Sequence, residues 1–158
     1  MIDREFRDQA AWALRRFLDC EIDNIDFENE LPHKPLFGKK RVADPALRAI
    51  EDYVWHWYDD LSVHKLDGLH KLDDEERALG ERCVLFLKSD IEYEWRNFRF
   101  VPGDLFSMEL ASQLPLDQQL AMNLNQPEGD VSVWPFFRRA DYELARNAPA
   151  QHDLSVRP

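Results

Sequence analysis

The sequence contains few glycines and cysteines and no long hydrophobic run. Among its 158 residues there are five glycines, nine prolines and two cysteines, whereas hydrophobic residues make up 44% and aromatic residues 12%. This composition excludes collagen-like, low-complexity and intrinsically disordered chains. No apolar stretch approaches the roughly 20 residues of a transmembrane helix. The first segment, residues 1–6, is charged from its third residue, so we expect no signal peptide there. We therefore expect one globular domain in the cytoplasm.

Motifs of common enzymes are also absent. The chain has no Gly-x-Ser-x-Gly nucleophile elbow, no His-Glu-x-x-His zinc motif and no glycine-rich phosphate loop. Cys20 and Cys83 each fall in an apolar pattern typical of a helix, without a cysteine or histidine at metal-binding spacing. We expect two reduced core thiols, with a disulfide as the alternative. The sequence predicts a protein that is not an enzyme and uses no metal or cofactor.

Basic residues are scarce in this chain. It has 20 Lys and Arg against 31 Asp and Glu, a net charge of −11 and a pI near 4.8. Such a charge repels nucleic acids and anionic membranes, so we expect neither as a partner. One loop rich in proline and glycine carries four basic residues: Lys34, Lys39, Lys40 and Arg41. These residues could bind a phosphate or a nucleic-acid backbone, but four charges beside a strongly acidic body favour equally the neutralisation of nearby acids within the molecule.

Several segments show the apolar spacing or the capping residues of amphipathic helices. Residues 4–20 follow Asp3, a suitable N-cap. Asp44 and Pro45 precede an apolar stripe that consists of Leu47, Ile50, Val54, Trp57, Tyr58 and Leu61. Asp73 and Glu76 form a capping-box pattern at the start of a further helix. Residues 25–31 fit a short helix or, because apolar and acidic residues nearly alternate, a strand; we favour the helix.

These helices predict a mainly α fold. We expect a single-domain irregular helical bundle over residues 1–147, followed by a loosely ordered tail, residues 148–158. Residues 104–124 predict two short helical pieces separated at Pro115. The aromatic segment 131–137 is β-prone and allows a short β-hairpin near the C-terminus. Residues 141–146 predict a final helical turn or two.

Aromatic and ionisable residues concentrate in residues 53–60. Tyr53 and Trp55 lie off the apolar stripe of their helix, so this helix is either buried nearly all round or leaves aromatic surface exposed for binding. A metal-dependent enzyme or sensor is an alternative function, because His56 and Asp60 in this segment have the i,i+4 spacing that puts two side chains on one helix face. The ligands would be His56, Asp60, His64 and, further along, His70.

Acidic residues are dense in two regions. Six acids and no base occur from Asp19 to Glu30, and residues 51–94 contain 13 acids against five bases. Solvated helix faces account for part of this excess, but it is larger than solubility requires. We therefore expect a surface that attracts a basic protein. The residues expected to attract it are Asp23, Asp26, Glu28 and Glu30, and those expected to anchor it are Tyr53, Trp55, Asp59 and Asp60.

Three segments, residues 19–30, 53–60 and 87–95, make the chain similar to small acidic bacterial proteins. The class that it resembles is the immunity proteins of polymorphic or contact-dependent toxins. The resemblance implies tight neutralisation of one basic toxin domain, often a nuclease, by a protein without catalytic residues. It implies no particular fold. We expect a monomer; a structural or regulatory subunit that pairs through exposed aromatic residues is a further alternative.

Overall fold

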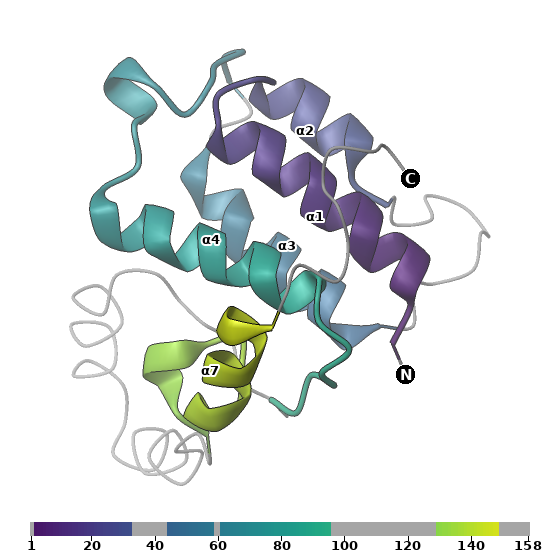
Figure 1. Cartoon of the computed structure of the whole chain (residues 1–158). Helices are drawn as coiled ribbons and strands as arrows, with labels where there is room; N and C mark the ends of the chain where they lie inside the picture. The colour runs from purple at the N-terminus through teal and green to yellow at the C-terminus, as the bar shows by residue number, and fades with distance from the viewer. Residues whose placement is uncertain (1, 33–43, 59–60, 96–128, 149–158) are drawn as a thin grey trace, which may run out of the picture.

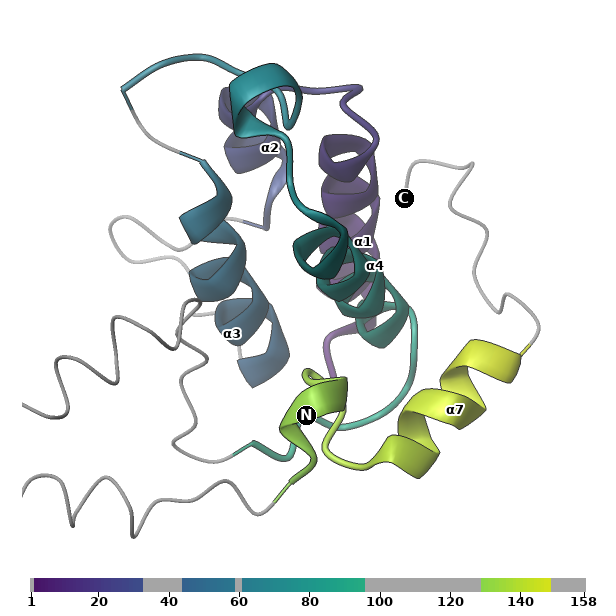
Figure 2. The same cartoon turned by 90° about the vertical axis from the view of Figure 1, so that its left-hand side faces the viewer.

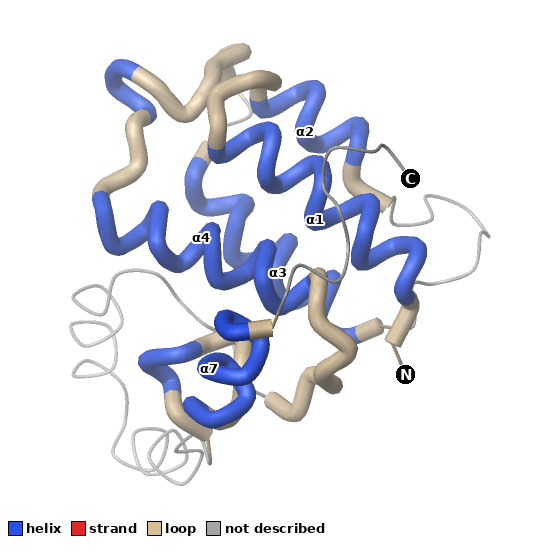
Figure 3. Tube along the Cα trace, viewed as in Figure 1, coloured by secondary structure: helices blue, strands red, loops and turns tan. Residues whose placement is uncertain are grey.

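The computed structural model describes residues 2–32, 44–58, 61–95 and 129–148 (Figure 1). The α-helices of these residues are α1 (Arg4–Leu18), α2 (Asn24–Glu30), α3 (Pro45–Val54), α4 (Asp74–Leu87) and α7 (Arg139–Asn147). Short 3-10 helices are η1 (Trp55–Trp57), η2 (Gly68–His70) and η3 (Val131–Val133). The mainly α fold is confirmed, and Figure 3 shows helices and loops but no strand in the described part of the chain.

The helix α1 lies at the centre of the bundle. It contacts α2, α3 and α4, and α4 also contacts α3 and α7. Figures 1 and 2 show α7 and η3 at one end of this bundle, while α2 lies at the other. The tight packing of α1 on α4 depends on Gly80, because a Cβ there would lie 2.7 Å from Cδ2 of Leu18 and 3.0 Å from Cη2 of Trp57. None of the described helices has the length and apolar composition needed to cross a lipid bilayer.

An aspartate starts each of the first four helices. The side chains of Asp3, Asp23, Asp44 and Asp73 each accept a backbone N–H from the first helical turn. The capping box of Asp73 and Glu76 is present in both directions. The preference for a helix over a strand in residues 25–31 is confirmed, while α1 ends at Leu18 rather than at residue 20.

The aromatic helix is shorter than the sequence predicts. It ends at Val54 and continues as the 3-10 turn η1, so the expected apolar stripe as far as Leu61 is wrong. Leu61 is 96% exposed. The tighter turn lets two neighbouring aromatic side chains reach different parts of the core. Trp57 packs edge-on against Tyr53, and Tyr58 packs edge-on against Phe17 and Phe27.

The expected β-hairpin does not form in residues 131–137. These residues make local turns instead: Val133 N–H donates to the Asp130 carbonyl oxygen, and Trp134 N–H to that of Val131. Because the turns satisfy the backbone, the aromatic side chains enter the core without a partner strand. Trp134 and Phe136 are fully buried. The helix expected at residues 141–146 is confirmed as α7, whereas residues 104–124 and 149–158 lie outside the described residues.

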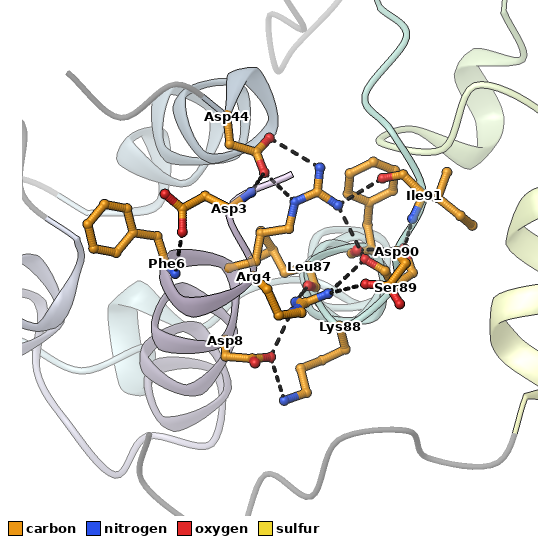
Figure 4. A network of polar contacts seen from close by, with 12 residues as sticks. Asp3, Arg4, Phe6, Asp8, Asp44, Leu87, Lys88, Ser89, Asp90 and Ile91 are labelled. Carbon is orange, nitrogen blue, oxygen red and sulfur yellow. Dashed lines mark hydrogen bonds and ion pairs between the residues drawn. The ribbon is translucent and has the colours of Figure 1, made fainter. Parts of the chain in front are cut away.

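A buried ion pair ties the start of α3 to α1. Nε of Arg7 lies 2.6 Å from Oδ2 of Asp44, Nη2 lies 3.1 Å from Oδ1, and both side chains are almost completely buried (Figure 4). Nη1 donates to the Ile91 carbonyl oxygen at 2.8 Å, and the guanidinium lies over the Phe86 ring. A single side chain therefore joins α1, α3 and the segment after α4.

The carboxylate of Asp44 has further donors. Backbone N–H groups of Asp3 and Ala46 each donate to it at 3.1 Å. Burial by itself raises the pKa of Asp44, but the hydrogen bonds and charge of Arg7, together with these two N–H groups, outweigh burial and lower the pKa. Asp44 is therefore ionised at neutral pH, and its oxygens are fully used inside the protein.

A second arginine of α1 closes the end of α4. Arg4 donates to the carbonyl oxygen of Leu87, the last residue of α4, and to that of Ser89 just beyond the helix (Figure 4). Asp8 accepts from both Arg4 and Lys88, the latter at 2.9 Å. The arginines of this region thus act as structural cross-links between α1 and α4.

Cys20 ends α1 in a left-handed conformation. Its φ is 57°, a region that glycine normally occupies at this position. The Cys20 N–H donates to the Phe17 carbonyl oxygen and the Glu21 N–H to that of Arg16, the hydrogen bonds of a Schellman motif. Cys20 therefore lies beyond the helix rather than on its core face as expected, whereas Cys83 is in the core; both are free thiols.

The variant Cys20→Gly is expected to be more stable than Cys20→Ala by about 1 kcal/mol, because alanine keeps the Cβ that disfavours a positive φ. Both variants lose the hydrogen bond from Sγ to the Leu66 carbonyl oxygen at 3.4 Å, so their difference isolates the backbone conformation. Urea unfolding of the two proteins measures it. Equal stability would show that this position is not strained.

Candidate functional site

The four acidic residues expected to attract a partner all belong to α2 or its N-cap. Asp23 is half-buried and accepts the Asp26 N–H at 2.9 Å. Glu30 holds both oxygens within 2.8 Å of Nη1 of Arg16. Asp26 and Glu28 are exposed and form no ion pair within the described residues. Of the four, these two are the exposed carboxylates without an ion pair in the described part of the chain; the basic residues Lys34, Lys39, Lys40 and Arg41 lie outside it.

The expected aromatic anchors divide between core and surface. Tyr53 is only 4% exposed, and its ring centroid lies 5.5 Å from that of Trp57 and 5.3 Å from that of Trp134. Burial raises the pKa of its hydroxyl. The expectation that Tyr53 contacts a partner is therefore corrected: it is a core residue. Trp55 is 53% exposed and stays a candidate, while residues 59 and 60 lie outside the described residues.

An exposed apolar loop lies next to α2, and sequence reasoning missed it. Its large side chains point to solvent: Leu61 is 96%, Val63 68% and Leu69 102% exposed. We use the name apolar loop for residues 61–70, which lie at the end of the bundle that holds the N-terminus of α2 (Figures 1 and 2). The signal in the sequence was three large aliphatic residues without helical or strand periodicity.

The apolar loop is fixed to the bundle by Asn24, which is buried. The Asn24 N–H donates to the His64 carbonyl oxygen at 2.9 Å, its side-chain amide donates to the Ser62 carbonyl oxygen at 3.1 Å, and its Oδ1 accepts the His64 N–H at 2.9 Å. Leu66, in the middle of the loop, is buried in the core. The exposed apolar side chains are therefore presented on an ordered backbone.

The expected metal ligands are not brought together by one helix. His56 lies in η1, and since α3 ends at Val54, the i,i+4 spacing to residue 60 does not define a helix face. His64 stacks on His70 with ring centroids 3.6 Å apart, and its Nε2 is buried and has no hydrogen-bond partner among the described residues. In the described ranges, no three His, Cys, Asp or Glu side chains form a group suited to a metal ion; Asp60 is outside these ranges.

The Cys83 thiol is enclosed in the core. Cys83 is fully buried, and burial raises the pKa of its thiol well above the ordinary value. The neutral thiol predominates at physiological pH and packs against its apolar neighbours.

The site has to be interpreted from its own geometry, because comparison with known proteins found no match. No protein-family model, curated protein or solved structure matches this chain. What the geometry offers is a surface at the α2 end of the bundle that has both exposed carboxylates, on α2, and exposed aliphatic side chains, on the apolar loop.

Proposed function

We propose that this protein is a binding module for a basic protein partner. The observation that supports it is that two features occur at the same end of the bundle: the exposed carboxylates Asp26 and Glu28 on α2, and the apolar loop. A net charge of −11 adds a long-range attraction for a cationic surface. The resemblance to immunity proteins makes a toxin domain the partner that we propose, with neutralisation as the outcome of binding.

Charge and apolar contact have different roles in such a module. Exposed carboxylates mainly raise the rate of association, because they attract the partner before contact, and this effect weakens as salt screens it. Apolar side chains act after contact and slow dissociation. A surface that combines both is suited to fast and lasting capture.

Reversing the charge of α2 is expected to slow association. With the partner purified by capture on the tagged protein from lysate of its source cells, Asp26→Lys and Glu28→Lys should together lower the association rate about tenfold at low salt, and the difference should vanish at high salt. Stopped-flow fluorescence measures the rate. Co-expression tests the finer proposal, since a toxin partner should arrest growth alone and not together with this protein.

A matched control is available on α7. Glu143 is an exposed residue of α7, the helix that Figure 1 shows at the end of the bundle opposite α2. Glu143→Lys changes the net charge as much as either single reversal does. Glu143→Lys should slow association less than Asp26→Lys or Glu28→Lys. Equal effects of all three would contradict a role for α2, and recovery of no basic protein, or only of further copies of this chain, would contradict the proposed function.

A further inference from the structure

We infer that the apolar loop is the anchor of the interface and that it docks on a basic amphipathic segment of the partner. This inference rests on the proposed function and names the chemistry of the partner segment. Its apolar side chains would contact the apolar loop, and its flanking lysine or arginine side chains would contact the acids around the loop.

Exposure of the loop is the first argument. Leu61, Val63 and Leu69 are exposed to an extent unusual for large aliphatic residues, and Ile25, which follows the loop-binding Asn24, adds a further exposed side chain at 42%. Grouped aliphatic residues on a surface mark sites of association. A folded partner that covers them removes apolar area from water, which is the principal source of affinity at interfaces.

Order of the loop is the second argument. The hydrogen bonds of Asn24 hold Ser62 and His64 in place, and Leu66 inserts into the core between the exposed positions. Cys20 Sγ donates to the Leu66 carbonyl oxygen at 3.4 Å. A loop whose backbone is fixed before binding loses little conformational entropy on association, so its apolar contacts contribute more to affinity.

Charge around the loop selects the partner. Asp26 lies one residue beyond Ile25, and Asp67, at the start of η2, is exposed within the loop. The loop's own cation, Lys65, donates to the Glu21 carbonyl oxygen at 3.3 Å. A second copy of this chain would bring its own acids against these carboxylates, which disfavours self-association through the loop. A basic segment with apolar side chains complements both features.

Two synthetic peptides test the inference: an amphipathic helix of lysine and leucine, and a peptide of equal charge made of lysine and glutamine. Isothermal titration calorimetry with the full chain should give at least about tenfold tighter binding of the lysine–leucine peptide. The triple variant Leu61→Ser/Val63→Ser/Leu69→Ser should weaken that binding about tenfold and leave the lysine–glutamine peptide unaffected. All three side chains are exposed, so the fold should persist, as circular dichroism would show.

The matched control is Leu144→Ser on α7, an exposed leucine at the other end of the bundle, which should change neither affinity. If the triple variant binds like the wild type while Asp26→Lys/Glu28→Lys weakens binding of both peptides, the inference is overturned and the proposed function stands. If neither peptide binds at low salt, both are overturned. If the wild type dimerises and the triple variant does not, the loop's occupant is a second copy, which overturns the inference.

Discussion

Replacing Asp44 with asparagine is expected to lower the free energy of unfolding by about 3–5 kcal/mol, because it leaves the buried Arg7 guanidinium without a counter-charge. The substitution is nearly isosteric, and the asparagine Oδ1 still accepts the Ala46 N–H that starts α3. The loss therefore reports the negative charge and the two hydrogen bonds that Oδ2 accepts, from Arg7 Nε and from the Asp3 N–H, rather than the cap. Thermal and urea unfolding followed by circular dichroism measure it.

The matched control is Asp52→Asn. Oδ2 of Asp52 lies 3.7 Å from Nε of Arg48 in an exposed i,i+4 ion pair. Such a pair contributes at most about 0.5 kcal/mol to the free energy of unfolding. Comparable losses of unfolding free energy at both positions would show that the buried Arg7–Asp44 pair stabilises the fold no more than an exposed pair does.

The pH dependence of the Asp44 effect has a definite sign. The folded protein lowers the pKa of Asp44 below its ordinary value of 3.8, so the stabilisation is complete above that value and is lost as the pH falls through the folded pKa. The difference between wild type and Asp44→Asn should be full at pH 7 and shrink below about pH 4. A difference that stays constant down to strongly acidic pH would contradict an ionised Asp44.

Replacing Trp134 with alanine is expected to lower the free energy of unfolding by about 3–5 kcal/mol in a single transition of the whole protein. Trp134 is fully buried, its ring lies against Tyr53, and its Nε1 donates to the Tyr93 hydroxyl at 3.3 Å. Its carbonyl oxygen accepts from Nε of Arg82 on α4 at 2.6 Å. These contacts join residues 129–148 to the same core as α3 and α4.

Trp55→Ala is the control for this variant, since it removes the same side chain from a half-exposed position. We expect a loss of less than about 1 kcal/mol there. Calorimetry distinguishes the outcomes. A separate low-temperature transition of Trp134→Ala would mean that residues 129–148 unfold independently and are not part of a single domain.

The two kinds of surface residue at the α2 end should be separable by experiment. Charge reversal at Asp26 and Glu28 acts on association and depends on salt, while serine substitution in the apolar loop acts on dissociation. Asn24 connects the two regions, because it lies within α2 and binds the loop. The geometry of the loop thus depends on the correct start of α2.

The sequence by itself determined the features that depend on neighbouring residues. Aspartate caps, the proline at the start of α3 and the pairing of Asp73 with Glu76 are interactions within a few residues, so they can be recognised without the fold. The same holds for the apolar spacing of α1 and the excess of acidic charge. The helical class follows from the local properties, and the negative net charge is a summed property of the composition.

Only the tertiary structure decided which side chains face solvent. Tyr53 is buried because Trp134, 81 positions away, packs against it, while Trp55 and, in the apolar loop, Leu61, Val63 and Leu69 are exposed. Arg7 has no local sign of burial, and it is satisfied by Asp44 and by carbonyl groups after α4. Burial and pairing of this kind arise between distant segments, and the sequence pattern around one residue does not contain the identity of its distant neighbours.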